Sequence, residues 1–264
     1  MFYLCCMLPF DPEILPFQEG VFVVGGFVRD FLLGTSPLDY DIAVDGDARA
    51  FAAHLASACN GHLVVLGKDD KAVFRVVKDP HTFDVVPLFG KNLIEDLKRR
   101  DFTINAMAFD LKNQEIIDPF NARHDLDTGT IKIVSDHVFQ DDPLRLLRAY
   151  RIGAVLNFKI LPDTRLAIKK FAHLINTPAG ERVQAELTKL FETPQSHRYL
   201  TQMTEDGLLD AMIPEFSKLR GCLQNEYHQF DVLEHTLTAY GHFEMILNKP
   251  ESILPQFASR LQSH

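Results

Sequence analysis

Two aspartates separated by one residue are the first side chains in this sequence whose spacing indicates chemistry. Asp39 and Asp41 lie in the stretch DYDIAV, which reads as a β-strand. Successive side chains of a strand point to opposite faces, so both carboxylates project on one face while Tyr40 and Ile42 project on the other. Neighbouring carboxylates repel each other unless a cation lies between them, and paired oxygen ligands on a rigid strand suit Mg²⁺. The pattern predicts a magnesium site, although aspartates at this spacing also cap loops at strand ends.

A third carboxylate on a neighbouring strand would complete a site for two metal ions. Asp84 is the candidate, because apolar residues flank it in the strand-like stretch HTFDVV. We therefore expect Asp39, Asp41 and Asp84 to be the catalytic residues and the metal ligands.

Two glycines and an arginine lie shortly before these aspartates. Gly25 and Gly26 separate the strand-like stretch VFVV from a short predicted helix, and Arg29 lies one turn into that helix. Free backbone N–H groups and the helix dipole favour phosphate at such a place, and Arg29 could reach the same phosphates. A pair of glycines before a helix is also a common turn. The order and close spacing of glycines, arginine and aspartates favour a nucleotide site.

The composition is that of a globular protein, with 264 residues, 46% hydrophobic residues and 24% charged residues. The net charge of −9 speaks against nucleic acid as a partner, but the charge is unevenly distributed. Residues 140–200 contain ten Lys or Arg and six Asp or Glu, a local excess of positive charge. Local charge decides whether phosphates are attracted, so this segment is either an RNA-binding surface or a solvated helical face.

The compartment is expected to be the cytoplasm. Four cysteines without regular spacing indicate neither a zinc site nor a disulfide framework. The apolar opening MFYLCCMLPF lacks a basic start and soon meets Pro9 and Asp11, so it resembles neither a signal peptide nor a spanning helix. No later apolar run reaches the roughly 20 residues that cross a bilayer. We expect no membrane partner.

The order of predicted elements indicates an α+β protein with a mixed sheet, followed by an all-helical remainder. Before residue 135 we expect strands over 21–26, 39–44, 62–67, 72–77 and 82–88, and helices over 27–34, 47–61 and the middle of 92–111. From Asp141 onward strand signals vanish, and helices are expected over 141–158, 164–175, 181–192, 197–212 and 232–247.

Five separated motifs occur here in the order of a known family: VGGFVRDFLLG with DYDIAV, RRDFTINAMAFDL, DPF with IKIV, DDPLRLLRAYRIGA, and GERVQAELTKLF. From about residue 20 to at least residue 192, the chain resembles the class II tRNA nucleotidyltransferases and bacterial poly(A) polymerases. The resemblance implies a nucleotidyltransferase head (1–139), a helical neck (140–200) and a helical body (201–264). It also implies an enzyme that uses Mg²⁺ to add C, A or both, from CTP and ATP, to the 3′ end of tRNA or another RNA.

The resemblance assigns roles to individual residues of the head. Asp39 and Asp41 would bind the metal, while Gly26 and Arg29 would contact the triphosphate. In RRD, Arg100 and Asp101 would contact phosphate or ribose. A second interpretation makes Asp101 the N-cap of a helix over FTINAMA.

The motif DDPLRLLRAYR concerns the choice of base. Pro143 at the first helical position, with Asp141 or Asp142 as the cap, predicts a firm helix start. The family resemblance makes Asp142 and Arg145 a protein template for the incoming base. An aspartate accepts from an exocyclic amine and an arginine donates to a ring nitrogen, a pattern that cytosine and adenine match and that guanine and uracil do not.

Arg148 and Arg151 continue the three-residue spacing of Arg145 and so lie within the same broad helix face. We expect them to contribute to nucleotide binding, and the alternative is a basic surface face.

The sequence departs from the family pattern at two places. Asp141-Asp142 stands where relatives have Glu-Asp, which keeps the recognising aspartate. Asn121-Ala122 stands where relatives often have two glycines after DPF, which affects how freely the head loop moves.

Other functions compete with RNA 3′-end addition. The stretch YHQFDVLEHTLTAY resembles the start of an HD-type metal phosphohydrolase, with His235 as a candidate ligand, but no aspartate follows Asp231. His228 and His235 are therefore expected to be packing or surface residues. A non-catalytic RNA-binding module is a further alternative, which the Asp39–Asp41 pair disfavours. The sequence ends soon after the HD-like stretch begins, as a piece of a longer enzyme would, and it predicts no oligomeric state.

Overall fold

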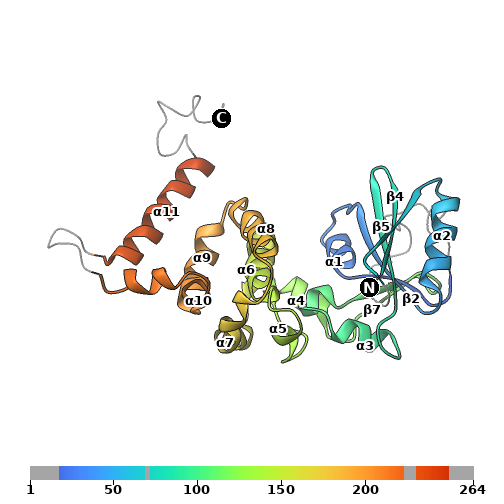
Figure 1. Ribbon diagram of the computed structural model, residues 1–264, viewed down its shortest axis with the longest axis horizontal. Coiled ribbons are helices and arrows are strands. Elements are labelled where there is room, and N and C mark those ends of the chain that lie inside the picture. Colours follow the sequence, from blue (N-terminus) through green and yellow to red (C-terminus); the bar gives the residue numbers. More distant parts are fainter. Residues whose placement is uncertain (1–17, 69–71, 223–229, 250–264) are drawn as a thin grey trace. The chain divides into compact units, whose positions relative to one another are not determined.

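The computed structural model describes residues 18–68, 72–222 and 230–249, and the chain forms two compact units. Unit 1 contains the described residues up to Thr128 together with Ile133–Ser135, and unit 2 contains Gly129–Lys132 and the described residues from Asp136 onward. The predicted α+β fold is confirmed, because a mixed sheet lies in unit 1 and helices dominate unit 2 (Figure 1).

Unit 1 is built on a seven-stranded sheet with the order β3-β4-β5-β2-β1-β6-β7. The strands are β1 (Val21–Val24), β2 (Asp39–Val44), β3 (His62–Leu66), β4 (Val73–Lys78), β5 (His81–Pro87), β6 (Ala108–Asp110) and β7 (Glu115–Ile117). The central pair, β2 and β5, is parallel, and every other neighbouring pair is antiparallel. A parallel pair brings residues distant in sequence side by side, here residues about 43 positions apart at the middle of the sheet.

The sheet is packed by α1 (Gly26–Leu32), which contacts β1 and β2, and by α2 (Ala48–Ala58), which contacts β2, β3, β4 and β5. Tyr40 of β2, fully buried, stacks between Phe27 of α1 and Phe83 of β5, with ring centroids 4.4 and 4.7 Å away. Burial of these aromatic rings fixes which face of β2 is internal. The residues that alternate with Tyr40 therefore project from the opposite face.

Among the described residues, helix packing on the opposite face lies at one end. There α3 (Leu93–Lys98) packs Leu93 and Leu97 against Val24 and Ala43 of the sheet. Ala43 points to the same side of β2 as Asp39 and Asp41, which lie nearer the start of the strand. The helix thus fills one half of this face and leaves the carboxylates exposed.

The predicted helix in the middle of residues 92–111 is wrong beyond Lys98. A short 3₁₀ helix, η2 (Thr103–Asn105), and strand β6 occupy the segment that the FTINAMA pattern assigned to a helix. The apolar side chains Phe102, Ile104, Ala106 and Ala108 are fully buried. Thr103, Asn105 and Met107 between them are buried as well, so the whole segment crosses the core instead of forming an amphipathic surface helix. The last element of the unit is α4 (Ala122–Asp127), whose N-cap Asn121 has a left-handed backbone conformation.

Unit 2 is mainly helical. Its elements are β8 (Thr130–Ile131), α5 (Val138–Asp141), α6 (Arg145–Leu156), β9 (Lys159–Ile160), α7 (Pro162–Phe171), η3 (Ala172–Asn176), α8 (Gly180–Phe191), α9 (Ser196–Glu205), α10 (Leu208–Met212), η4 (Pro214–Leu219) and α11 (Val232–Asn248). The central helix α6 packs against α8 and α9. Gly153 permits the approach to α9, since a Cβ there would lie 2.7 Å from the ring of Tyr199.

Two expectations for this region are corrected. The remainder is not all-helical, because β9 pairs in parallel with β8. Residues 197–212 do not form one helix, because Gly207, at φ +74°, separates α9 from α10. The finer division into a neck (140–200) and a body (201–264) stays a prediction. No helix in the described ranges has both the length and the apolar character needed to cross a bilayer.

Candidate active site

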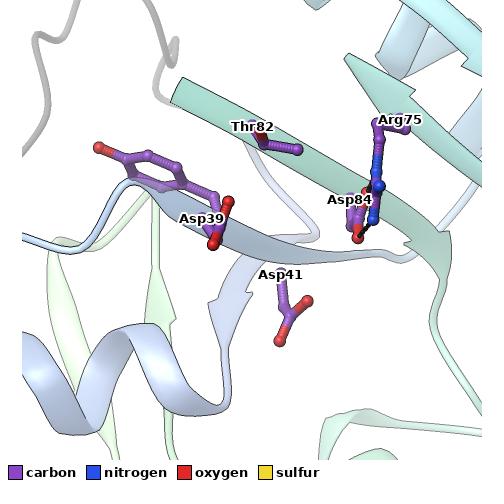
Figure 2. A pocket seen from close by; sticks show the side chains of 6 residues that line it. Asp39, Asp41, Arg75, Thr82 and Asp84 are labelled. Atoms are coloured by element: carbon purple, nitrogen blue, oxygen red, sulfur yellow. Dashed lines mark hydrogen bonds and ion pairs between the residues drawn. The ribbon is translucent and has the colours of Figure 1, made fainter. Parts of the chain in front are cut away.

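Asp39 and Asp41 lie on the exposed face of β2, as the alternation predicted. Both residues are exposed, while Tyr40 and Ile42 between and after them are buried. Figure 2 shows both side chains projecting from the strand. The two carboxylates are positioned by a rigid central strand and are accessible from solvent.

Asp84 lies beside this pair, because Asp41 of β2 and Asp84 of β5 are directly opposite each other in the parallel register. The three aspartates line one pocket of about 310 Å³ together with Tyr40, Arg75 and Thr82 (Figure 2). The predicted juxtaposition of Asp84 with Asp39 and Asp41 is confirmed, and its role stays a prediction.

Arg75 is a site residue that the sequence did not reveal. It lies opposite Asp84 on β4, and its Nε and Nη2 donate to Asp84 Oδ1 and Oδ2, each over 2.7 Å (Figure 2). This two-point hydrogen bond raises the pKa of the Arg75 guanidinium, and the negative charges of Asp39 and Asp41 add to the effect. The signal in the sequence was one charged residue inside the apolar strand VFRVV.

The donor set can be tested for a magnesium site. In the described ranges, no group of three or more His, Cys, Asp or Glu side chains is arranged to hold a metal ion. Asp84 is already bound at both oxygens by Arg75. Mg²⁺ in nucleotide sites, however, is usually held by one or two carboxylates, with substrate phosphates and water as the other ligands. Asp39 and Asp41 fit that requirement.

The Gly25-Gly26 turn adjoins the carboxylates. Gly25 has φ +78°, and a Cβ at this residue would lie 2.5 Å from Arg100 Nη1 and 3.3 Å from Asp41 Oδ2. A Cβ at Gly26 would lie 3.4 Å from Arg29 Nη2. The structure therefore brings both predicted arginines to the two glycines, and a side chain at Gly25 would be strained and would displace Arg100.

Arg29 is held in place by several acceptors. Its Nε and Nη2 donate to the carboxylate of Asp30 over 2.7 and 2.8 Å, and its Nη1 donates to Asn105 Oδ1 over 2.6 Å. Asp30 thus balances the charge of Arg29. Arg29 therefore offers oriented N–H groups but little net positive charge.

Asp101 is buried and belongs to the same hydrogen-bond network. Its Oδ1 accepts from the backbone N–H of Phe102 over 2.8 Å and from Asn105 Nδ2 over 2.9 Å. The prediction that Asp101 caps a helix is wrong, because only the 3₁₀ turn η2 follows and its N-cap is Phe102. Asp101 instead orients Asn105, which in turn holds Arg29.

The base-template residues lie in unit 2, at the start of α6. The predicted helix start at Pro143 is wrong, since α6 begins at Arg145 and Pro143 lies in the preceding turn. Asp142 accepts from the backbone N–H of Leu144 over 3.3 Å and pairs with Arg182 of α8 over 3.2 Å. Arg145 is half-buried and donates from Nη1 to the carbonyl of Val138 over 3.1 Å.

The other two arginines of α6 differ in their surroundings. Arg151 donates from Nε to Glu186 of α8 over 2.5 Å, a half-buried ion pair between two packed helices. Arg148 is also half-buried. Their predicted role in nucleotide binding stays a prediction, and the Arg151 contact supports at least a structural role in joining α6 to α8.

The rival HD-type site has no assembled ligand set in the described residues. His235 lies in the first turn of α11, where its backbone N–H donates to the carbonyl of the N-cap residue Asp231 over 2.9 Å. No metal-holding group of His, Cys, Asp or Glu side chains occurs in this part of the described chain. His228 lies outside the described residues.

Comparisons with known proteins agree with these motifs. A family model described as the poly A polymerase head domain matches residues 21–88 and 72–132. A second, described as the probable RNA- and SrmB-binding site of polymerase A, matches residues 157–219.

Two curated relatives illustrate the similarity. The chain is 42% identical over 204 residues to a CC-adding tRNA nucleotidyltransferase of Synechocystis sp., a match that covers 76% of this chain and 48% of the relative. It is 35% identical over 248 residues to an A-adding tRNA nucleotidyltransferase of Deinococcus radiodurans, covering 92% and 56%. The chain thus spans about half the length of these relatives.

Solved structures give the same result. A CCA-adding enzyme in complex with CTP matches with a TM-score of 0.67 and 34% identity, over 74% of this chain and 48% of that chain. The Thermotoga maritima CCA-adding enzyme in complex with tRNA matches with a TM-score of 0.68 and 33% identity, over 78% and 50%.

Proposed function

Because the chain belongs to the family of tRNA nucleotidyltransferases and bacterial poly(A) polymerases, we propose that it is a template-independent RNA 3′-end nucleotidyltransferase. Its substrates are CTP, ATP or both, and the 3′ end of tRNA, as the names and titles of its relatives suggest. The organisation into a nucleotidyltransferase unit and a helical unit suits such an enzyme.

The reaction is an in-line displacement at phosphorus. The RNA 3′-hydroxyl oxygen forms a bond to the α-phosphorus of the nucleotide, the bond from that phosphorus to the bridging oxygen of the β-phosphate breaks, and pyrophosphate leaves. The hydroxyl proton is released to solvent. Such transfers depend mainly on positioning and on electrostatic stabilisation of the phosphates.

The observation that carries the proposal is the convergence of three features in unit 1. The exposed pair Asp39 and Asp41 adjoins the side-chain-free turn at Gly25, and the Arg100 guanidinium lies against that turn. Gly25 leaves room for a phosphate to approach the backbone, and Arg100 and Arg29 orient donors toward it. Asp39 and Asp41, with Asp84 as a further candidate, would hold Mg²⁺, which when bound activates the hydroxyl and neutralises charge on the leaving group.

Base selection is assigned to unit 2. Asp142 would accept from the exocyclic amine of cytosine or adenine, and Arg145 would donate to the adjacent ring nitrogen. The present partner of Asp142, Arg182, is more than half exposed, and exchanging such a surface ion pair costs only about 0–1 kcal/mol. Guanine and uracil would place a carbonyl opposite the Asp142 carboxylate and an N–H opposite the Arg145 guanidinium. Such a mismatch is unfavourable in a site that excludes water.

The relatives include CC-adding, A-adding and CCA-adding enzymes, so the product is decided by experiment. The full chain is incubated with Mg²⁺ and tRNA transcripts that end before CCA, after C or after CC. Labelled CTP and ATP are supplied separately. Ordered addition on all three transcripts identifies CCA synthesis, extension of one class identifies a CC-adding or A-adding enzyme, and long A tails identify poly(A) synthesis.

Matched variants test the assignment of the carboxylates. Asp39→Asn and Asp41→Asn are expected to lower incorporation by at least about 100-fold, since even the outer partners of metal ligands contribute 10–100-fold. Asp45→Asn, an exposed residue on the same chain segment that does not line the pocket, is expected to retain activity. Incorporation that survives the double change of Asp39 and Asp41 would rule the proposal out.

A further inference from the structure

Asp96 is a buried carboxylate to which the proposed reaction gives no role. It is 0% exposed and lies in α3, on the helix face that also carries Leu93 and Leu97. A charged side chain in an apolar stripe is costly unless partners compensate for its lost hydration. The contacts of Asp96 therefore indicate what its charge is used for.

The two oxygens of Asp96 have different partners. Oδ1 accepts from the backbone N–H of Phe89 over 3.2 Å and from Nε and Nη2 of Arg99 over 3.1 and 2.9 Å. Oδ2 accepts from Nη2 of Arg100 over 3.3 Å. One oxygen thus anchors α3 to the preceding loop and to Arg99, and the other is directed at Arg100.

Arg100 reaches from Asp96 to the nucleotide turn. Its side chain is 18% exposed, and its other terminal nitrogen, Nη1, is the atom that a Cβ at Gly25 would meet at 2.5 Å. Among the described residues, Arg100 Nε is buried and has no hydrogen-bond partner. The hydrogen bond from Nη2 to Asp96 therefore fixes the rotation of this guanidinium about its long side chain.

We propose that Asp96 is a positioning residue for the nucleotide triphosphate: it holds the Arg100 guanidinium against Gly25, next to Asp41, before the nucleotide arrives. The proposal rests on the proposed function and adds a residue to it. An arginine without such an acceptor must be ordered when the phosphate binds, at a cost of about 0.5–1.5 kcal/mol for an immobilised long side chain. Pre-orientation removes that cost from binding.

The test compares the full chain with Asp96→Asn, Arg100→Ala, the double variant, and Arg99→Ala as the control. Direct binding of CTP in the presence of Mg²⁺ is measured together with KM and kcat for extension of a tRNA transcript. Asp96→Asn is expected to raise Kd and KM by about 3–10-fold, the effect of the ordering cost above, with kcat changed by less than about 3-fold. The double variant is expected to bind no more weakly than Arg100→Ala alone, because Asp96 acts through Arg100.

Arg99→Ala distinguishes positioning from a structural role. It removes the larger partner of the same carboxylate, yet Arg99 is not part of the proposed nucleotide site. Thermal stability should fall in both Asp96→Asn and Arg99→Ala, whereas only Asp96→Asn should change nucleotide binding. The inference would be overturned if Asp96→Asn and Arg99→Ala bound CTP equally well. It would also be overturned if the losses of CTP binding caused by Asp96→Asn and Arg100→Ala added up in the double variant. Either result would leave the proposed function intact.

Arg100→Lys keeps the inference testable if Asp96→Asn does not fold. Lysine keeps the charge but presents one ammonium group, which cannot bridge Asp96 and Gly25 as the forked guanidinium does. Its KM should rise as in Asp96→Asn, and an unchanged KM would overturn the inference. A wild-type chain that neither binds CTP nor extends RNA would overturn the proposed function as well.

Discussion

At the scale of single residues, the three aspartates of the pocket are not equivalent. Asp39 and Asp41 are exposed on β2, whereas both oxygens of Asp84 are bound by Arg75. Arg75 thus places a positive charge where a third metal ligand was expected. The pocket combines three carboxylates with one guanidinium, so removal of the guanidinium changes the electrostatics of the whole site.

Arg75→Gln is expected to lower the Mg²⁺ concentration that gives half-maximal incorporation by about 2–5-fold, the equivalent of about 0.5–1 kcal/mol for a partly exposed charge. The reason is that Asp84 would then add its negative charge to those of Asp39 and Asp41. Titration of activity with Mg²⁺ measures the effect, with Lys78→Gln at the far end of the same strand as the control. An unchanged requirement would show that Asp84 is electrostatically separate from the pair.

Gly25→Ala should weaken nucleotide binding more than it weakens the fold. The new Cβ would lie 2.5 Å from Arg100 Nη1 and would displace it, while the positive φ adds about 1–2 kcal/mol of backbone strain. Gly34→Ala is the matched control, because Gly34 has φ +79° but no atom within 4 Å of its added Cβ. Both variants should lose stability, and only Gly25→Ala should raise KM for CTP.

How far the sequence predicts the site depends on the range of the interactions. Asp39 and Asp41 could be predicted because strand alternation is local, and Asp84 because its strand pattern was clear. Arg75 and Asp96 could not, because their roles depend on the hairpin register of β4 with β5 and on the packing of α3. The signal for Arg75 was a single charge within an apolar pattern, whereas Asp96 lies among other charged residues and gave no such signal.

At the scale of elements, α6, α7 and α9 of unit 2 are joined by one buried carboxylate. Asp206, 3% exposed and C-cap of α9, accepts from Tyr150 of α6 and from Arg165 of α7, with distances of 2.8 Å. The central helix that carries Arg145 is therefore fixed to two neighbours through a single side chain.

Asp206→Asn is expected to lower the free energy of unfolding by about 1–3 kcal/mol, because Tyr150 and Arg165 would lose their charged, buried acceptor while Arg165 keeps its ion pair with Glu205. Urea denaturation followed by circular dichroism measures it. Glu205→Gln is the control, since Glu205 binds the same arginine from an exposed position and should contribute less than about 1 kcal/mol. Equal losses in the two variants would show that the buried contact is not special.

Element boundaries were the weakest predictions from the sequence. The run FTINAMAF contains good helix formers, yet residues 102–108 are all buried in the core and form a 3₁₀ turn followed by the start of β6. Tertiary burial overrode local propensity there. Gly207 and the two-residue strand β9 were missed for a related reason, because a short pairing or a single left-handed residue leaves little periodic signal.

At the scale of the whole molecule, both units contain tyrosines whose hydroxyl pKa is raised in the folded state. Burial raises the pKa of Tyr40 in unit 1 and of Tyr199 in unit 2. Burial, together with the neighbouring Asp206 carboxylate, raises the pKa of Tyr150 far above its ordinary value. In the unfolded chain these groups lose their protons near pH 10.

The chain should therefore lose stability as the pH rises above about 10, because the unfolded state then binds fewer protons than the folded state. Above about pH 10, each such tyrosine lowers the free energy of unfolding by up to about 1.4 kcal/mol per pH unit. Below about pH 9 its effect on stability does not change with pH. Urea midpoints between pH 8 and 11 measure the slope. The stability of the Tyr150→Phe variant should fall less steeply with pH than that of the parent chain. An equal slope would contradict the assignment of the effect to Tyr150.

The path of the chain between the units has a consequence for limited proteolysis. Residues 129–132 belong to unit 2, where β8 pairs with β9, while Ile133–Ser135 belong to unit 1, where Ile133 bridges Phe102 and Val134 donates to the carbonyl of Asp101. After a cut behind the exposed Lys132, the N-terminal fragment would still contribute residues 129–132 to unit 2. The C-terminal fragment would still contribute Ile133–Ser135 to unit 1. The two fragments would be interlaced, and separating them would require local unfolding as well as the cut.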